Sequence, residues 1–215
     1  LPTSFEGYAD VLRRLGYPVK LEFTSIFPPE GGNLRPLSDI IGEKKNFQQW
    51  IGIAPFAAHE GKILPTEKTE ELIKEISRRH PSCRIFLFGG GEKEHAVLNA
   101  WCERYNNCTN ASQALSSLKE EMVVMSHLDV MVSMDSGNMH LAAISGTRVI
   151  SVWGETHPYA GFLGWNQRPE DCIQADLPCR PCSIYGNKPC QRGDYACLTS
   201  IDPITIADKV DWSLN

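Results

Sequence analysis

The sequence lacks the features that would place it in several common classes of protein. No apolar run approaches the roughly 18 residues that span a bilayer, and the first residues have neither the basic nor the apolar region of a signal peptide. There is no cluster of basic residues, and the formal net charge is −5, which argues against nucleic acid as the main partner. We therefore expect a cytoplasmic protein.

Signatures of nucleotide hydrolysis and of dinucleotide binding are missing too. Neither a P-loop nor a G-x-G-x-x-G turn occurs, and there are no internal repeats or low-complexity segments. The 215 residues, 42% hydrophobic and 22% charged, suffice for one sizeable core with room for part of a second domain. Because the chain begins at Leu1 rather than at a methionine, in what reads as the middle of a fold, we expect a fragment or an excised domain.

From Trp50 onward, short apolar runs alternate with amphipathic segments. Alternation of this kind is typical of crossover connections in a mostly parallel sheet. We therefore predict an α/β, Rossmann-like fold with helices flanking the sheet. The predicted strands are 50–54, 84–88, a short one near Cys108, 130–132 and 149–152, and the predicted helices are 66–79, 92–105, 111–119, 122–127, 137–146 and 203–212.

The first 45 residues have a different pattern. Apolar residues at helical spacing predict an amphipathic helix over 5–15, closed by Gly16, and a short strand is predicted over 19–23. A stretch rich in proline and glycine follows at 28–36 and is too full of breakers for regular structure. We expect residues 1–45 to be the tail of a preceding domain with a linker, and residues 46–215 to be one Rossmann-like domain.

The most informative stretch is a strand that runs into Asp135-Ser136-Gly137 and then into a helix. The start of a helix leaves backbone N–H groups unpaired and carries partial positive charge, so this turn is a candidate phosphate site. Ser136 can donate its hydroxyl, Gly137 allows close approach, and His140 lies one turn further on the same face. The plainer alternative is an ordinary helix start with Asp135 or Ser136 as its cap.

A second polar loop, from Trp153 to Pro158, follows the next predicted strand and contains Gly154 and Thr156. In open α/β sheets, ligands sit outside the carboxyl ends of adjacent strands. We therefore expect the two loops to form a pocket together.

Two further loops contain candidate ligand-binding residues. Lys62 follows the first predicted strand, where it could neutralise a phosphate or be an ordinary solvated charge. Glu92 and Glu94 follow the glycine triplet at 89–91, which is either a nucleotide-binding turn or a tight connection. Either acid could stabilise the helix dipole or accept hydrogen bonds from ribose hydroxyls.

Taken together, these motifs resemble the carboxyl-terminal half of glycosyltransferase family 9, the ADP-heptose:lipopolysaccharide heptosyltransferases. The resemblance extends from about residue 51 to the end of the chain. It rests on Pro55, Lys62-x-x-Pro65, Gly89-Gly90 followed by acids, Asp135-Ser136-Gly137-x-x-His140-Leu141-Ala142-Ala143 and Gly154-x-Thr156-x-Pro158. The sequence departs from the family pattern at Glu155, where a proline is usual, and this places an extra negative charge near the expected diphosphate.

The resemblance implies one half of a GT-B glycosyltransferase, which binds an ADP-heptose or a related nucleotide sugar and needs no obligatory cofactor or metal. It implies that Lys62, Ser136 and Gly137 hold the diphosphate and that Glu92 or Glu94 holds the ribose. Asp135 would contact the sugar or order the loop, and His140 would support the turn.

The same resemblance bears on catalysis and location. The family's general base is an aspartate early in an amino-terminal domain, so no catalytic residue is expected in this chain, which would bind the donor without transferring it. The acceptor would be a lipopolysaccharide core bound by that other domain, at the inner face of the inner membrane.

Eight cysteines are many for a cytosolic protein. Cys83, Cys102 and Cys108 have apolar neighbours and are expected to be core residues. The other five lie in a Cys-rich loop at 172–197, in which one pair has the C-x-x-C spacing of structural zinc sites. Disulfides, a metal and free thiols stay open for the four cysteines at 179, 182, 190 and 197, although a reducing cytosol argues against permanent bridges.

Two functions of different classes follow from the sequence. The first is an enzyme part, the donor-binding half of an inverting heptosyltransferase. The alternative is a non-catalytic module that binds a nucleotide sugar or phosphate. The particular sugar, the acceptor and the oligomeric state are not specified by these residues.

Overall fold

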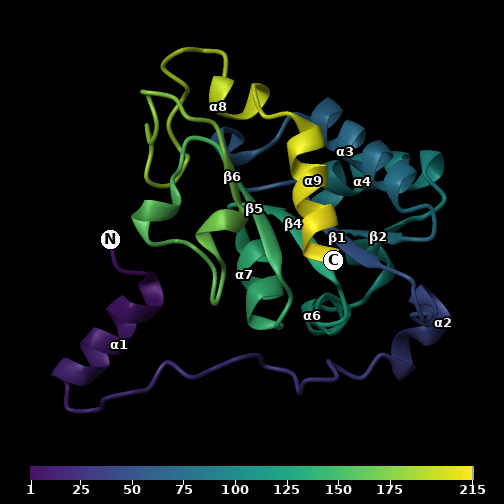
Figure 1. Cartoon of the computed structure of the whole chain (residues 1–215), viewed down its shortest axis with the longest axis horizontal. Coiled ribbons are helices and arrows are strands. Elements are labelled where there is room, and N and C mark those ends of the chain that lie inside the picture. The colour runs from purple at the N-terminus through teal and green to yellow at the C-terminus, as the bar shows by residue number, and fades with distance from the viewer. Residues whose placement is uncertain (215) are drawn as a thin grey trace.

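The protein, described by a computed structural model over residues 1–214, contains a six-stranded parallel sheet (Figure 1). The strands are ordered β3-β2-β1-β4-β5-β6, and all five neighbouring pairs are parallel. This confirms the predicted α/β, Rossmann-like fold. The strands are β1 Trp50–Ala54, β2 Arg84–Leu87, β3 Cys108–Asn110, β4 Val130–Met134, β5 Val149–Trp153 and β6 Cys172–Gln174.

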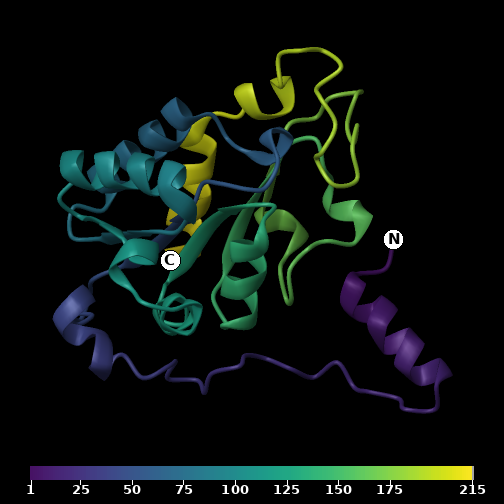
Figure 2. The same cartoon turned by 180° about the vertical axis from the view of Figure 1, so that it is seen from behind.

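Helices cover both faces of the sheet (Figure 2). Alternate side chains of each strand therefore enter two different cores: Ile51 and Ile53 of β1 pack in one, and Trp50 and Ala54 in the other. The first core is closed by α3 Thr66–Arg79, α4 Gly91–Arg104 and α9 Pro203–Leu214. The second is closed by α2 Ser38–Ile41, α5 Ala111–Ala114, α6 Leu118–Met125 and α7 Gly137–Ile144.

The amino-terminal helix α1, Ser4–Arg14, agrees with the prediction and begins with a capping box between Thr3 and Glu6. It lies beside the sheet, and an extended segment passes below the sheet to α2 (Figures 1 and 2). The predicted strand at 19–23 is wrong. This segment has no sheet edge beside it, and the Phe23 carbonyl accepts a hydrogen bond from Trp165 Nε1 instead, at 2.8 Å.

Two helix boundaries also differ from the prediction. The helix expected over 111–119 ends at Ala114, and the next helix begins at Leu118 rather than near Met122. The cause is local, because Ser117 is an N-cap whose hydroxyl accepts from the Glu120 N–H at 3.3 Å. The prediction also missed α2, β6, α8 Ala196–Thr199 and four short 3₁₀ helices, η1 Arg35–Leu37, η2 Glu60–Lys62, η3 Pro158–Ala160 and η4 Pro169–Asp171.

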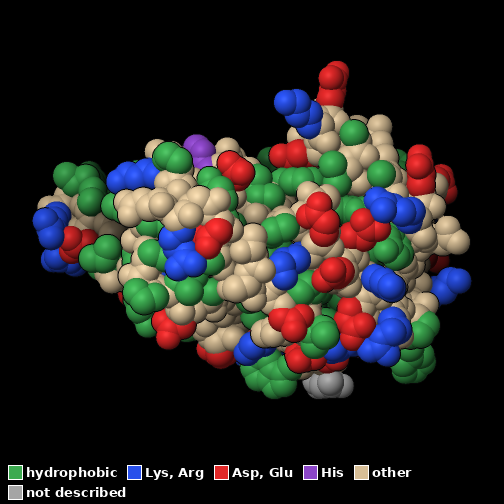
Figure 3. Space-filling model, turned by 90° about the horizontal axis from the view of Figure 1, so that it is seen from above, with side chains coloured by type: hydrophobic (Ala, Val, Ile, Leu, Met, Phe, Trp, Pro, Cys, Tyr) green, Lys and Arg blue, Asp and Glu red, His purple; other side chains and the backbone are tan. Residues whose placement is uncertain are grey.

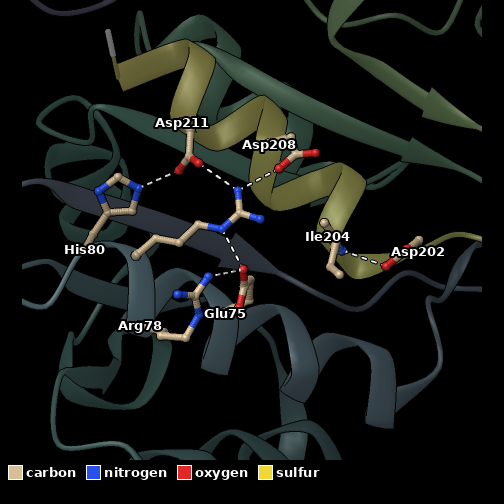
Figure 4. A network of polar contacts seen from close by, with 8 residues as sticks. Glu75, Arg78, His80, Asp202, Ile204, Asp208 and Asp211 are labelled. Carbon is tan, nitrogen blue, oxygen red and sulfur yellow. Dashed lines mark hydrogen bonds and ion pairs between the residues drawn. The ribbon is translucent and has the colours of Figure 1, made fainter.

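A polar network joins α3 to α9 on the outside of the first core (Figure 4). Arg79 is at its centre, with Nε 2.7 Å from Glu75 Oε1 and Nη1 2.7 Å from both Asp208 Oδ1 and Asp211 Oδ2. His80 Nε2 lies 2.7 Å from the other oxygen of Asp211. These contacts fix the carboxyl-terminal helix against α3. Over residues 1–214, no helix is both long and apolar enough to span a membrane.

Candidate functional site

The order of the strands creates a switch point between β1 and β4. From β1 the chain moves to β2 and β3, and then returns to the other side of β1 as β4. Loops that leave neighbouring strands in opposite directions open a crevice at their carboxyl ends, where open α/β sheets bind ligands. A pocket of about 270 Å³ lies at this place, lined by Ala58, Lys62, Asp135, Ser136, Gly137, His140, Phe162 and Tyr185.

An ion pair joins the two sides of this switch point. Lys62, after β1, places Nζ 3.0 Å from Oδ2 of Asp135, after β4, and the Asp135 side chain is only 6% exposed. The same Asp135 oxygen accepts a hydrogen bond from Thr156 Oγ1 at 2.8 Å. Asp135 thus ties the loops after β1, β4 and β5 together, and it holds the Lys62 ammonium at the pocket.

The start of α7 forms the second part of the pocket. Ser136 is the N-cap of α7, but its side chain makes no capping hydrogen bond, and its hydroxyl lies 3.3 Å from Ser133 Oγ. Apart from its chain neighbours and the backbone of α7 itself, a Cβ built on Gly137 meets no atom of the described residues within 4 Å. The positive end of the helix therefore faces open space, which suits an anion such as phosphate.

His140 lines the pocket one turn into α7, as the spacing predicted. Burial lowers the pKa of its imidazole below the ordinary value. The Asp135 carboxylate raises this pKa and the nearby Lys62 ammonium lowers it, and the net shift is downward. The neutral ring is therefore favoured near pH 7, and it can exchange hydrogen bonds without adding charge.

The structure places the other predicted residues outside the pocket lining. Glu92 and Glu94 lie in the first turn of α4, after β2, where the Glu94 carboxylate accepts from the Gly90 N–H at 2.7 Å. Gly154 packs so closely against the loop of Lys62 that a Cβ at this position would overlap the Gly61 carbonyl oxygen. Thr156 is fully buried behind Asp135. Residues 154–158 therefore support the pocket from behind, whereas the sequence had suggested that they form one wall.

Glu155 does not project into the pocket. It is fully buried beneath Gly61, and neither carboxylate oxygen has a hydrogen-bond partner among residues 1–214. Burial raises the pKa of this carboxyl, and the nearby Glu60 raises it further. The extra negative charge expected near a diphosphate is thus weakened, because burial favours the neutral acid.

Two aromatic residues in the lining were not identified from the sequence. Phe162 follows β5 and Tyr185 belongs to the Cys-rich loop, and their ring centroids are 5.8 Å apart. Neither lies in a periodic pattern or a motif, since both come from segments without strand or helix. Only the tertiary structure brings them to the same pocket as Lys62.

The cysteines of this loop are free thiols in the structure. Among the described residues, no three Cys, His, Asp or Glu side chains are grouped so that they could hold a metal. Seen from above, the surface has acidic and basic side chains interspersed, with no large area of one charge (Figure 3). This agrees with the absence of a basic cluster from the sequence.

The open parallel sheet, with a pocket at its switch point, defines a Rossmann-like α/β class of domain. A model of glycosyltransferase family 9 (heptosyltransferase) matches residues 36–190. The chain belongs to this family, which confirms the resemblance found in its motifs.

Individual relatives agree with this assignment. Lipooligosaccharide heptosyltransferase 2 of Campylobacter jejuni is 20% identical over 173 residues, which cover 77% of this chain and 52% of that protein. A solved family 9 glycosyltransferase from Veillonella parvula superposes with a TM-score of 0.74 at 16% identity, over 99% of this chain and 60% of that one. The solved structure of Escherichia coli heptosyltransferase WaaC with ADP-2-deoxy-2-fluoro heptose superposes with a TM-score of 0.58 at 19% identity, over 94% of this chain and 52% of that one. The chain spans about half the length of the curated relatives it matches.

Proposed function

We propose that this chain binds the ADP-sugar donor of a heptosyltransferase. The observation that carries the proposal is the meeting of the Lys62 ammonium and the uncapped start of α7 in one pocket at the switch point. Both are positive, and together they suit a diphosphate. The donor analogue in the related WaaC structure supports an ADP-sugar as the ligand.

In this proposal the diphosphate displaces the Asp135 carboxylate from Lys62. Asp135 then keeps its hydrogen bond from Thr156, and so continues to order the loops after β4 and β5. Ser136 and the amide of Gly137 donate to the phosphate, and the neutral His140 supports the turn. No metal is required, because the ammonium and the helix start neutralise the ligand.

The nucleoside would lie on the side of β2. The glycine turn at 89–91 connects the end of β2 to α4. Apart from its chain neighbours, a Cβ at Gly90 would meet no atom of the described residues within 4 Å, so the space beside this turn is open. Because Glu94 already accepts from the Gly90 N–H, we assign the ribose hydroxyls to Glu92, which is exposed. Its carboxylate can accept from two neighbouring hydroxyls.

The same charges would assist transfer. Negative charge builds on the diphosphate as the glycosidic bond breaks, so donors aimed at it stabilise the transition state more than the ground state. For inversion, a carboxylate base must activate the acceptor hydroxyl on the opposite side of the sugar. We propose that this base belongs to an acceptor-binding domain, and that the acceptor is a lipopolysaccharide core at the inner face of the inner membrane. Residues 1–45 would then be the tail of that domain.

Calorimetric titration of the chain with ADP, ADP-heptose and UDP tests the proposal. We expect ADP and ADP-heptose to bind, and UDP to bind more weakly. If neither adenine nucleotide bound, the proposal would be wrong. A heptosyl-transfer assay with the chain joined to an acceptor-binding domain would then separate an enzyme part from a module that only binds.

A further inference from the structure

The Cys-rich loop reaches from the far edge of the sheet to the pocket. Tyr185 lines the pocket, and the next residue, Gly186, has a positive φ of 71° and lies against Lys62. A Cβ at Gly186 would be 2.7 Å from Lys62 Cγ and 2.9 Å from its Cε. The loop therefore confines the aliphatic part of Lys62 and brings an aromatic ring into the pocket that Lys62 also lines.

The loop is held in this place by buried and partly buried hydrogen bonds. The Arg180 guanidinium donates to the carbonyl oxygen of Gly154 at 2.6 Å and to that of Thr156 at 2.9 Å. The Ser183 hydroxyl is buried and accepts from the Gly186 N–H at 2.8 Å. Since these bonds fix the backbone on both sides of Tyr185, the place of this residue at the pocket is set by the fold, although the residue is 59% exposed.

The strand order gives the pocket a direction. The loops after β1 and β4 carry the groups proposed for the diphosphate, and the loop after β2, with Glu92, lies on one side of them. Phe162 follows β5 and Tyr185 follows β6, so both come from the opposite side. A ligand anchored by its diphosphate, with its nucleoside toward β2, must point its other end at these two rings.

We propose that Phe162 and Tyr185 form the subsite for the sugar ring of the donor, and that the Cys-rich loop serves to present Tyr185 there. The inference rests on the proposed function, because it takes the diphosphate as the fixed centre of the ligand. Aromatic rings offer a large rigid apolar surface, and Tyr adds a hydroxyl that can bond to a sugar. Such rings suit the C–H face of a sugar and leave its hydroxyls to polar partners.

The test compares two ligands that differ only in the sugar. The chain and its Phe162→Ala and Tyr185→Ala variants are titrated with ADP and with ADP-heptose. We expect each variant to bind ADP within about twofold of the parent and to bind ADP-heptose about fivefold to tenfold more weakly. Tyr185→Phe, which keeps the ring, should retain most of the affinity.

Ile184→Ala is the matched control. Ile184 precedes Tyr185, is similarly exposed at 60%, and is not part of the pocket lining. It should leave both affinities unchanged, and circular dichroism should show the same fold in all variants.

The outcomes separate the two proposals. If the parent chain bound neither ligand, the proposed function would fail and this inference with it. Where ADP binds but the ratio of the two affinities is the same in parent and variants, only this inference is overturned. An equal loss of ADP and ADP-heptose would assign the rings to the nucleoside, and would overturn it as well.

Discussion

Lys62 and Arg79 are both held by carboxylates, but their surroundings differ. Lys62 faces one carboxylate, that of Asp135, beside open space at a helix start. Arg79 faces three, from Glu75, Asp208 and Asp211, in a network where each carboxylate is engaged. Around Lys62, the ammonium and the positive helix start together exceed the one negative charge of Asp135. Around Arg79, the three carboxylates exceed the positive charge of the guanidinium. The comparison teaches that a partly buried cation indicates an anion site only where its charge is not already matched.

The largest effect is expected from Lys62→Met. Removing a cation that contacts a diphosphate costs a charge-assisted interaction, and Asp135 would then repel the ligand, so ADP affinity should fall about 100-fold. Calorimetric titration measures this. Lys74→Met, on the exposed side of α3, is the matched control and should bind ADP normally.

Because Lys62→Met leaves Asp135 buried without its cation, a loss of folding must be separated from a loss of binding. In the double variant Lys62→Met/Asp135→Asn the stranded charge is gone, and the urea midpoint should return toward that of the parent. ADP binding should stay weak. Recovery of full affinity in the double variant would contradict the role given to Lys62.

The open space at the helix start is tested by glycine substitutions. Gly137→Val should fold normally, since a Cβ there meets no neighbour among the described residues, and yet weaken ADP binding about tenfold by filling the pocket. Gly154→Ala should instead lower the unfolding free energy, because its Cβ overlaps the Gly61 carbonyl oxygen. Thermal melts together with ADP titrations distinguish the two. Normal ADP affinity in Gly137→Val would show that the ligand lies elsewhere.

The polar network around Arg79 should contribute to stability but not to ADP binding. Arg79→Met removes the central cation, which is 17% exposed, and leaves three acids close together. We expect the unfolding free energy to fall by about 1–2 kcal/mol in urea titrations, with ADP affinity unchanged. Arg78→Met, at an exposed position, should change it much less. Weaker ADP binding in Arg79→Met would contradict the view that this cation, unlike Lys62, has no part in binding the ligand.

The smallest effect concerns pH. Hydrogen bonds from Arg78, and then from Arg79, lower the pKa of Glu75 from 4.5 to about 2. A carboxylate with a depressed pKa in the folded state adds stability above the unfolded value of 4.5, and this stability is lost as the pH falls toward 2. The unfolding free energy should therefore drop more steeply over this range in the parent than in Glu75→Gln. Parallel pH profiles would mean that Glu75 titrates normally.

Much of the fold was readable from local pattern. The five-residue strand over 50–54, the helix over 66–79 and the turn at Asp135-Ser136-Gly137 agree with the structure because a short apolar run, a proline stop and small turn-forming residues act locally. The strand expected over 19–23 failed for the opposite reason. A strand exists only where another strand's edge is available, and the sequence does not state which edges are free.

The candidate site divides in the same way. The sequence identified five residues that all line one pocket: Lys62, Asp135, Ser136, Gly137 and His140. The contributions of Phe162 and Tyr185 were invisible, since these residues lie in irregular segments that only tertiary contacts position.

The sequence by itself determined that a parallel sheet forms and that one of its turns opens a helix with small polar residues, because hydrophobic patterning and the turn preferences of single residues are short-range properties. Only the tertiary structure decided that β1 and β4 lie side by side, that Lys62 and Asp135 meet across this junction, and that the Cys-rich loop brings Tyr185 to the same pocket. Those contacts join residues that are far apart in the chain, and their geometry depends on the packing of the whole domain.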